Sequence, residues 1–332
     1  MSSDNYAGRL SEYKNKGICG LPEKNETKRA MDSKIKRLIE LIRTSRHTTV
    51  LTGAGISTAA GIPDFRGPKG IWTQEEDEKK RMRKDRSQSK KRRLHDSHSI
   101  GTTSTKTTSS GDCDKDSSSA TTHRDKKGKK DSESKSTIAA ECTPSASFET
   151  AKPTITHRAI TYLSSPEVDK IQYCITQNVD GLHMRSGISR DRHCFLHGCI
   201  FTETCDSCQK EYFRDFDIGG VSFKETGRKC DETDCTGLLR DTILDWEDAL
   251  PEHDWERAQD ECEKSDVVLA LGTSLRIEPA GSLVTLGKKF VIVNKQDTPY
   301  DSSAELVIRA NVDDVMLKVM NGLGLSLPDP DK

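Results

Sequence analysis

Four cysteines form the most specific chemical pattern in this chain of 332 residues. Two residues separate Cys205 from Cys208, four separate Cys230 from Cys235, and 21 residues lie between the two pairs. Thiolates at this spacing are typical of the two knuckles of a zinc ribbon. Because four thiolates fill a tetrahedral site and exclude water, we expect a structural Zn²⁺ that stabilises a small module over residues 199–240. The alternative is four unrelated thiols.

A second stretch of unusual composition, GAGISTAAGIPDFRG, occupies residues 53–67. A Gly-Ala-Gly turn at the end of a strand can bring backbone N–H groups close to phosphates, and a helix after it would add its positive end. We therefore expect Gly53 and Gly55 to approach a nucleotide. Asp64, Phe65 and Arg66 would place a carboxylate, a ring and a cation beside it. A tight strand-to-helix turn that binds nothing is the alternative.

Polar side chains gather again in TQNVDGLH, residues 176–183. Gln177, Asn178 and Asp180 offer hydrogen-bond donors and acceptors, which suit ribose hydroxyls and a carboxamide. A loop that only caps a helix is the alternative here. His197, in the sequence FLHGC, is a candidate general base because the pKa of imidazole lies near neutral pH.

The elements that must position these residues alternate between helices and strands. Apolar residues at helical spacing predict helices over residues 33–46, 154–163 and 312–325. Short apolar runs predict strands over residues 47–53, 171–176, 266–275 and 290–294. This alternation predicts an α/β fold, a Rossmann-like parallel sheet with helices on both faces. The motifs TGAGIS, TQNVDG, GTSL and NKQ each follow a strand, where such sheets bind ligands.

One segment, residues 75–147, differs in composition from the rest of the chain. Residues 75–141 contain no Trp, Tyr or Phe, so they cannot bury enough apolar surface to fold, and we expect a long disordered insert. The rest would form a Rossmann-like catalytic domain, the cysteine module and a short tail. The catalytic domain would comprise residues 1–74, 148–198 and 241–325, and the tail residues 326–332.

The insert begins with ten basic residues among the fifteen at positions 79–93. Their two clusters resemble a nuclear import signal, and the same charge would attract the phosphates of chromatin DNA without reading sequence. A solvated, charged linker is the alternative. The net charge of −1 argues against a polyanion-binding surface over the whole chain. With no leader and no apolar run of membrane length, we expect an intracellular protein without a membrane partner.

Taken in order, the glycine-rich stretch, TQNVDGLH, LHG, the paired cysteines, GTSL and VIVN resemble the sirtuin family of NAD-dependent protein deacylases. GPKGIWT, RDTILDWEDALP and DDVMLKVMNGLGLSLP are similar to the class IV branch of that family, the sirtuin-6 group. The resemblance covers nearly all of the chain outside the insert, which follows Trp72 where the branch has a short connection. It implies NAD and Zn²⁺ as cofactors.

The resemblance also implies a role for each matching residue. NAD would lie across the carboxyl ends of the strands, Asn178 and Asp180 would hold its nicotinamide end, and His197 would take a proton from the ribose hydroxyls. Trp246 would line the channel for an acylated lysine. The contacts to NAD would come from Ala54, Thr58, Phe65, Arg66, Trp72, Gln177, Gly272, Thr273, Ser274, Asn294, Lys295, Gln296 and Val312.

The implied activity removes acyl groups from protein lysines and releases nicotinamide and 2'-O-acyl-ADP-ribose. Histones in the nucleus are the expected substrates. Two alternatives stay open: mono-ADP-ribosyl transfer to proteins from the same bound NAD, and a chromatin scaffold that senses NAD without turnover. The preferred acyl chain does not follow from the spacing of residues.

Overall fold

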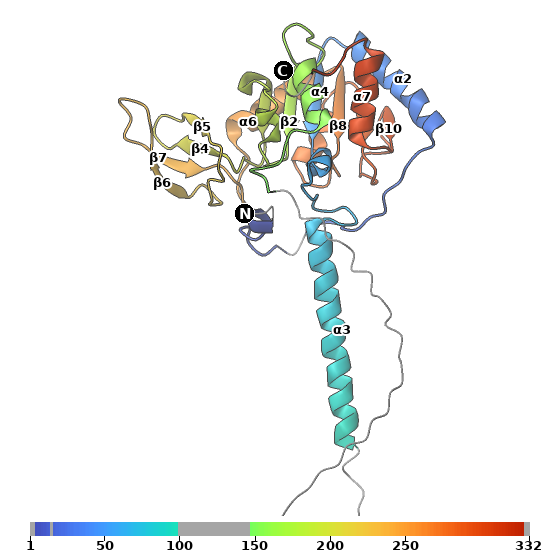
Figure 1. Cartoon of the computed structure of the whole chain (residues 1–332), viewed down its shortest axis with the longest axis vertical. Coiled ribbons are helices and arrows are strands. Elements are labelled where there is room, and N and C mark those ends of the chain that lie inside the picture. Colours follow the sequence, from blue (N-terminus) through green and yellow to red (C-terminus); the bar gives the residue numbers. More distant parts are fainter. Residues whose placement is uncertain (1–3, 14–15, 99–146, 329–332) are drawn as a thin grey trace, which may run out of the picture. The chain divides into compact units, whose positions relative to one another are not determined.

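The computed structural model of the protein describes residues 4–13, 16–98 and 147–328 (Figure 1). The chain divides into two compact units, which are considered separately. The larger unit comprises residues 1–78 and 145–332, and the smaller one residues 79–144. Every site described below belongs to the larger unit.

A six-stranded sheet forms the centre of the larger unit. Its strands lie in the order β10-β9-β8-β1-β2-β3, and all neighbouring pairs are parallel. They are β1 (Thr48–Thr52), β2 (Tyr173–Thr176), β3 (His193–Phe195), β8 (Val267–Leu271), β9 (Phe290–Val293) and β10 (Leu306–Ile308). From β1 the chain adds β2 and β3 on one side of the sheet, and from β8 it adds β9 and β10 on the other side. The strand order therefore reverses between β1 and β8. That reversal is where open α/β sheets bind their ligands.

Both faces of this sheet are covered, so every residue of its central strands β1 and β8 is buried, the threonines of β1 included. In β1, Val50 packs in the core on one face and Leu51 in the core on the other. The first core contains α2 (Lys28–Thr44), α4 (Ile155–Leu163) and α7 (Val312–Gly322). The second contains α6 (Glu252–Lys264) and a 3₁₀ helix (Ala280–Thr285). The predicted fold class is therefore confirmed.

Each element expected in the parallel sheet region is present, with boundaries that shift by a few residues. The helix expected over 33–46 begins earlier, because Thr27 caps α2 by accepting a hydrogen bond from the backbone N–H of Ala30. Helix α6 was not expected. Its buried face is short, and it includes Asp254, Ala258 and Cys262, so it lacks a clear apolar period. Strands β3 and β10 have three residues each, too few for a periodic signal.

A second, four-stranded antiparallel sheet lies beside the parallel sheet in the larger unit (Figure 1). Its order is β5-β4-β7-β6. The strands are β4 (Thr202–Cys205), β5 (Glu211–Phe213), β6 (Glu225–Lys229) and β7 (Leu238–Asp241). Glu203 is buried within it and accepts hydrogen bonds from Arg214, Thr226 and Arg228. Burial raises the pKa of Glu203, but these three donors outweigh burial and hold that pKa below its usual range.

The first residues of the expected insert are helical, whereas the sequence predicted disorder. Helix α3 runs from Ile71 to His98, so residues 75–98 are helical, whereas disorder was expected from residue 75. The sequence of this stretch contains no Gly or Pro and is rich in Glu, Lys and Arg, which are good helix formers. Low hydrophobicity was therefore a poor guide to local helix formation. Residues 99–146 lie outside the described residues.

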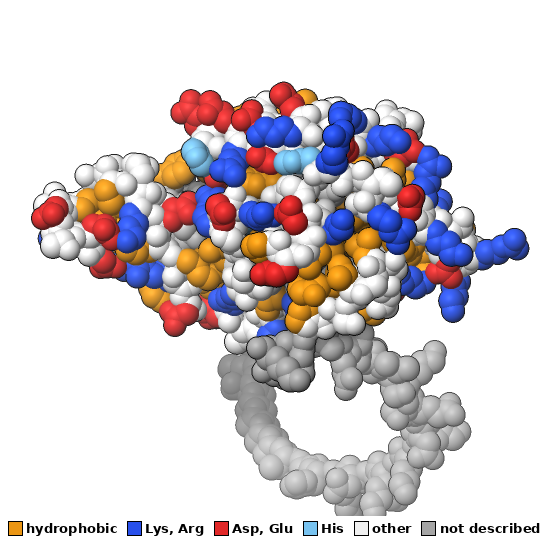
Figure 2. Space-filling view, turned by 90° about the horizontal axis from the view of Figure 1, so that it is seen from above, with side chains coloured by type: hydrophobic (Ala, Val, Ile, Leu, Met, Phe, Trp, Pro, Cys, Tyr) orange, Lys and Arg blue, Asp and Glu red, His pale blue; other side chains and the backbone are white. Residues whose placement is uncertain are grey.

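Smaller elements complete the larger unit. Two helices have four residues each, α1 (Asp4–Ala7) and α5 (Leu182–Arg185). Short 3₁₀ helices span Ala54–Ile56, Thr58–Ala60 and Arg190–Arg192. Within the described ranges, no helix combines the length and the apolar character needed to cross a membrane. Basic, acidic and apolar side chains are interspersed over the face shown in Figure 2.

Candidate functional site

A cavity of about 720 Å³ opens at the carboxyl ends of the parallel strands. Loops that follow β1, β2, β3, β8 and β9 all contribute to its wall, so the cavity lies at the reversal of strand order. Its volume is within the range of pockets that bind cofactors. Sixteen of the residues singled out in the sequence line it: Gly53, Ala54, Gly55, Asp64, Phe65, Arg66, Trp72, Gln177, Asn178, His197, Trp246, Gly272, Thr273, Ser274, Asn294 and Gln296.

The two glycines after β1 serve a purpose that differs from the expected one. The backbone N–H of Gly53 donates to Leu271 O at 3.1 Å, and that of Gly55 donates to Gly272 O at 2.8 Å. A Cβ on Gly55 would lie 2.7 Å from Gly272 O. These glycines therefore allow the ends of β1 and β8 to approach closely, and their N–H groups are already bound within the protein rather than directed at a phosphate.

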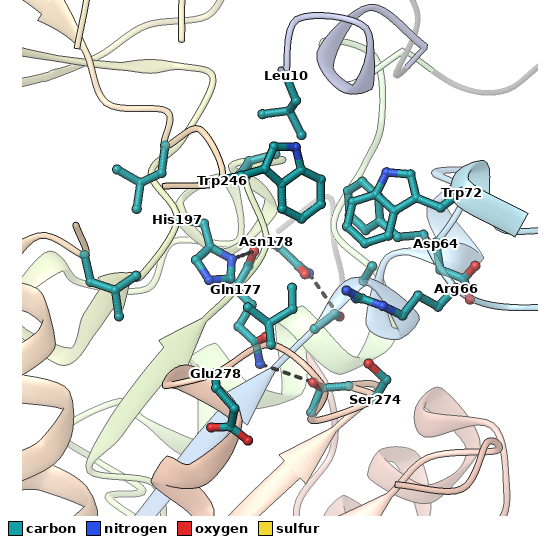
Figure 3. Close-up of a pocket in the computed structure, with 18 of the residues that line it drawn as sticks. Leu10, Asp64, Arg66, Trp72, Gln177, Asn178, His197, Trp246, Ser274 and Glu278 are labelled. Carbon is teal, nitrogen blue, oxygen red and sulfur yellow. Dashed lines mark hydrogen bonds between the residues drawn. The ribbon is translucent and has the colours of Figure 1, made fainter. Parts of the chain in front are cut away.

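Arg66 is held in place on one wall of the cavity (Figure 3). Its Nε donates to Lys16 O at 2.8 Å, and its guanidinium lies 4.5 Å from the ring centre of Trp72. Burial lowers the pKa of Arg66 to about 10, which leaves the side chain charged at neutral pH. Asp64 accepts a hydrogen bond from Gly67 N at 2.9 Å, and burial raises the pKa of this carboxyl. The loop thus holds a fixed cation beside an aromatic ring.

Gln177 and Asn178 connect the end of β2 with neighbouring loops. Nε2 of Gln177 donates to Thr273 Oγ1 at 3.1 Å. Nδ2 of Asn178 donates to Gly53 O at 3.1 Å and to Ser57 Oγ at 3.2 Å. Asn178 is 7% exposed, so this buried amide is oriented by its partners before any ligand binds.

Asp180 lies behind the cavity wall rather than in it. Its Oδ2 accepts a hydrogen bond from Ser57 Oγ at 2.6 Å, and its Oδ1 accepts one from Leu182 N at 3.0 Å. Burial raises the pKa of Asp180, and these two hydrogen bonds oppose that shift. Because Ser57 contacts both Asp180 and Asn178, the carboxylate can act on the cavity through Ser57. Nothing in the sequence pattern pointed to Ser57.

His197 follows β3 and lies half-buried in the cavity wall (Figure 3). Its Nδ1 is 3.1 Å from Gln177 O. A carbonyl oxygen only accepts, so Nδ1 carries the hydrogen and Nε2 keeps its lone pair. Burial lowers the pKa of His197 to about 4, a backbone hydrogen bond to Gln177 opposes this shift, and the charge of Arg66 adds to it. The imidazole is therefore neutral at pH 7 and can accept a proton at Nε2.

An aromatic group covers another side of the cavity. The rings of Trp72 and Trp246 have centroids 5.0 Å apart, and Tyr13 stacks on Trp246 at 4.7 Å. Nε1 of Trp246 donates to Ser11 O at 3.0 Å. In Figure 3, Leu10 and Trp246 lie on one side of the cavity and Ser274 and Glu278 on the other. The N-terminal segment therefore helps to form this wall.

Several lining residues were not predicted, and four predicted ones do not line the cavity, Asp180 among them. The unpredicted group consists of Tyr6, Leu10, Gly67, Val179, Leu244, Asp245, Asp248, Ala249, Leu250, Glu252, Trp255, Ile277, Glu278 and Pro279. Most of these are apolar or come from loops without a polar motif, so no residue pattern marked them. Thr58 is exposed, Lys295 pairs with Glu23 at 3.4 Å, and Val312 packs in the core.

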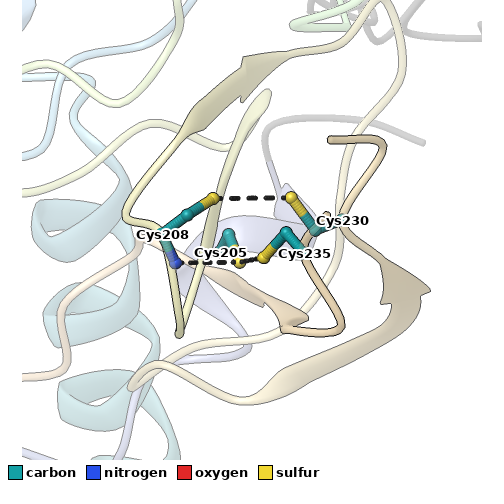
Figure 4. A group of neighbouring side chains, drawn as sticks. All are labelled: Cys205, Cys208, Cys230 and Cys235. Carbon is teal, nitrogen blue, oxygen red and sulfur yellow. Dashed lines mark hydrogen bonds between the residues drawn. The ribbon is translucent and has the colours of Figure 1, made fainter. Parts of the chain in front are cut away.

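The four cysteines of the small module come together at one end of its sheet (Figure 4). The Sγ atoms of Cys205 and Cys235 are 3.5 Å apart, and those of Cys208 and Cys230 are 3.6 Å apart. These distances are too long for disulfides. Four sulfurs at about 2.3 Å from one zinc in tetrahedral geometry would lie roughly 3.8 Å from one another. The donor set therefore fits Zn²⁺ with every position filled by protein.

A glycine makes room for this site. A Cβ on Gly237 would lie 2.4 Å from the Sγ of Cys205 and 2.8 Å from the Cβ of Ser207. The N–H groups of Ser207 and Cys208 are 3.4 Å and 3.5 Å from the same sulfur. Such contacts stabilise a thiolate. The module thus has the steric and electrostatic features of a closed metal site.

Comparison with known sequences places the chain in a family. It matches the Sir2 family over residues 53–113 and 114–279. It is 38% identical over 327 residues to NAD-dependent protein deacetylase SRT1 of Arabidopsis thaliana. That alignment covers 97% of this chain and 56% of the plant protein. It is 36% identical over 338 residues to NAD-dependent protein deacetylase Sirt6 of Drosophila melanogaster, covering 98% and 87%. The chain spans about half the length of the plant protein.

The fold agrees with these matches. A solved structure described as a Sir2 variant with a deacetylated p53 peptide and 3'-O-acetyl ADP ribose superimposes with a TM-score of 0.55 at 27% identity. The alignment covers 88% of this chain and 100% of that chain. The sequence match includes the glycine-rich loop, the cavity residues after β2 and β8, and the cysteine module. The chain belongs to the Sir2 family.

Proposed function

We propose that this chain is an NAD-dependent deacylase of protein lysines that releases nicotinamide and 2'-O-acyl-ADP-ribose. The observation that carries the proposal is the neutral imidazole of His197, whose free Nε2 lies in a cavity lined by amide, hydroxyl and guanidinium groups. Family membership supports the same activity, since SRT1 and Sirt6 are both named NAD-dependent protein deacetylases.

The chemistry of the cavity fits NAD. Arg66 supplies a cation for a diphosphate, and Ser274 and Asn294 supply hydrogen-bonding groups at the ends of β8 and β9. Phe65 and Trp72 offer ring surfaces, with centroids 4.7 Å apart. We propose that the sixteen lining residues listed above include the contacts to NAD. Thr58, Lys295 and Val312 remain predictions, since they would have to act from outside the lining.

The protein residues would orient the reactants and move one proton. Bound NAD supplies a glycosidic bond whose cleavage exposes the ribose carbon to the acyl oxygen. Asn178, with Asp180 behind it through Ser57, would hold the nicotinamide end. Nε2 of His197 would take a proton from a ribose hydroxyl, a contribution of about 10² to 10⁴ in rate for a general base. Trp246 and the apolar side chains near it would line the path of the acylated lysine.

The test combines purified full chain, NAD and peptides that carry acetyl-lysine or long-chain acyl-lysine. Mass spectrometry should detect free lysine peptide, nicotinamide and 2'-O-acyl-ADP-ribose in equal amounts. His197→Ala should lower the rate by about 10² to 10⁴ while NAD binding, measured by calorimetry, persists. His253→Ala is the matched control, because the side chain of His253 is 88% exposed. It should leave the rate unchanged.

Two other outcomes of this experiment would each support a different function. An ADP-ribosylated protein without deacylated peptide would identify a mono-ADP-ribosyltransferase that uses the same cavity. NAD binding without release of nicotinamide would leave an NAD-sensing scaffold. The absence of NAD binding by a folded protein would remove all three readings.

We further propose that the substrates are histones or other chromatin proteins and that the protein works in the nucleus. The ten basic residues among positions 79–93 support this, because they combine two clusters of an import-like signal with a charge that attracts DNA phosphates. Positions 79–93 all lie within helix α3. The deletion described in the Discussion tests this proposal.

A further inference from the structure

A second group of possible metal ligands lies within the parallel-sheet core, apart from the four cysteines. It consists of Cys174, His183 and His193, whose ligand atoms all lie within 4.8 Å of one another. None of the three side chains is more than 1% exposed. The group is not part of the cavity lining described above.

The fold brings these residues together from three elements. Cys174 of β2 and His193 of β3 are direct partners in the register of the parallel sheet, so their side chains leave the sheet on the same face. His183 comes from α5, and its ring centroid is 5.2 Å from that of His193. Both ring nitrogens of His183 lie 3.9 Å from the Sγ of Cys174. A thiol and two imidazoles therefore lie close together, and because Nε2 of His183 is 3.0 Å from Thr52 Oγ1, Nδ1 is the nitrogen left to bind a metal.

The ring of His193 has unsatisfied hydrogen-bonding atoms. Both of its ring nitrogens are buried, and neither has a hydrogen-bond partner among the described residues. Buried polar atoms of this kind are uncommon and carry a desolvation cost. Burial lowers the pKa of His183 to about 3 and that of His193 well below its usual value. Both imidazoles are therefore neutral, which is the form that binds metal ions.

Charge and ligand number distinguish between the metals that thiolate and imidazole prefer, which are Cu⁺ and Zn²⁺. One thiolate neutralises Cu⁺ but leaves a Zn²⁺ site with a net positive charge, which is costly in a buried environment. The charge of Arg190 already acts on His193 and would add to that cost. Three ligands suit the trigonal geometry that Cu⁺ adopts, whereas protein zinc is almost always bound by four.

We propose that Cys174, His183 and His193 form a buried Cu⁺ site. Metal–ligand bonds of roughly 2.0 to 2.3 Å, as found in zinc sites, place trigonal donors about 3.8 Å apart. The contacts between Cys174 and His183 already have this separation. The most distant donor pair would need to close by roughly 1 Å.

Binding requires an entry route and the release of one proton. Cu⁺ replaces the thiol hydrogen of Cys174: a Cu–S bond forms, the S–H bond breaks, and H⁺ passes to solvent, so the bound site is neutral. Burial raises the pKa of this thiol, so the metal must displace the proton. Helix α5 has only four residues, and its local opening would expose His183 to an incoming ion.

The test uses the full chain loaded with zinc and titrated anaerobically with Cu⁺ from a bathocuproine disulfonate complex. Elemental analysis should find one copper bound per chain and the zinc of the cysteine module retained. X-ray absorption at the copper edge should show a shell of one sulfur and two nitrogens. A copper bound to the cysteine module would instead have an all-sulfur shell and would displace zinc.

Matched variants assign the ligands. Cys174→Ala and His193→Leu should abolish the copper uptake without loss of zinc. Cys194→Ala should retain it, because Cys194 is as buried as Cys174 but lies on β3 next to His193 and packs in the core on the opposite face of the sheet. If a variant fails to fold, the absorption spectrum of the unmodified chain still decides. No copper uptake, an all-sulfur shell, a second zinc in place of copper, or uptake that survives both ligand substitutions would overturn the proposal.

Discussion

The tautomer of His197 depends on a single backbone group. Gln177 O accepts the hydrogen of Nδ1 at 3.1 Å and thereby leaves Nε2 as the basic nitrogen. Burial then keeps the ring neutral, with a pKa of about 4. A histidine in this state is ready to accept a proton throughout the neutral range, although each proton it accepts must be passed on before the next turnover.

The first prediction concerns the pH dependence of the free enzyme. The neutral form of His197 is the active base, so kcat/KM should fall as the pH drops through its pKa. Because burial lowers that pKa to about 4, the acidic limb of the profile should lie well below the pKa of a free imidazole, about 6.5. Steady-state deacetylation rates at a series of pH values, with NAD and peptide below their KM, measure this limb.

Two controls make the pH measurement decisive. Circular dichroism at each pH identifies the range in which the protein stays folded. His253→Ala should leave the profile unchanged, because His253 is exposed and outside the cavity lining. An acidic limb near pH 6.5 in folded protein would contradict the state of His197 described here.

At the scale of elements, the cysteine module depends on a metal and on space for it. Its strands β5 and β6 have largely exposed or half-exposed side chains, so a hydrophobic core contributes little there. The buried carboxylate of Glu203 and four thiolates connect its strands instead. Gly237 lies against one of these sulfurs.

The second prediction is that Gly237→Ala weakens zinc binding by at least about tenfold, since the new methyl group would meet the Sγ of Cys205 at 2.4 Å. Competition with a chromophoric chelator measures the affinity, and elemental analysis counts the zinc. The melting temperature should fall as zinc is lost, because a structural metal contributes folding free energy.

Gly227→Ala in β6 of the same module is the control. Gly227 has a φ of 79°, and a Cβ there would meet nothing within 4 Å. That substitution should cost about 1 to 2 kcal/mol of backbone strain without changing zinc affinity. Equal loss of zinc in both variants would show that strain in the module, and not contact with Cys205, controls the site.

At the scale of the whole molecule, the chain combines a folded unit that holds both sites with a separate unit over Lys79–Pro144. The residues of the cavity, the parallel-sheet core and the cysteine module all fall within residues 4–78 and 147–328. Folding and chemistry should therefore be separable from whatever the basic segment binds.

The third prediction follows from this division. Replacement of residues 79–144 by a short Gly-Ser linker should change the free energy of unfolding by less than about 1 kcal/mol, or roughly 2 to 4 °C in melting temperature. Deacetylation of a free peptide should stay within about twofold. Binding to duplex DNA should fall sharply, because 18 Lys and Arg residues are lost, ten of them at positions 79–93, and each phosphate contact contributes about 0.9 to the salt slope.

A shorter deletion identifies the DNA-binding part. Removal of residues 99–144 keeps the basic residues at positions 79–93 and should preserve DNA binding measured by fluorescence anisotropy at several salt concentrations. If the longer deletion binds DNA as well as the full chain does, the basic segment is not the contact, and the proposed chromatin role loses its support.

The sequence alone determined which chemistry the chain could support and on which strands. Apolar runs such as VVLAL before GTSL and FVIV before NKQ predicted buried parallel strands, because such strands are apolar on both faces. Once the strands are parallel, their carboxyl ends meet at one edge, so Arg66, Gln177 and Ser274 were expected to converge. Cysteine spacing likewise indicated the zinc module without any knowledge of its strands.

The tertiary structure decided how those groups are held and what else lies beside them. The hydrogen on Nδ1 of His197, the link from Asp180 through Ser57, and the bound N–H groups of Gly53 and Gly55 all depend on partners distant in the chain. So does the pairing of Cys174 with His193, because a shift of one residue in the register of β2 and β3 would turn one of them to the other face. Local patterns carry period and residue type, whereas register and burial arise only when separate segments pack together.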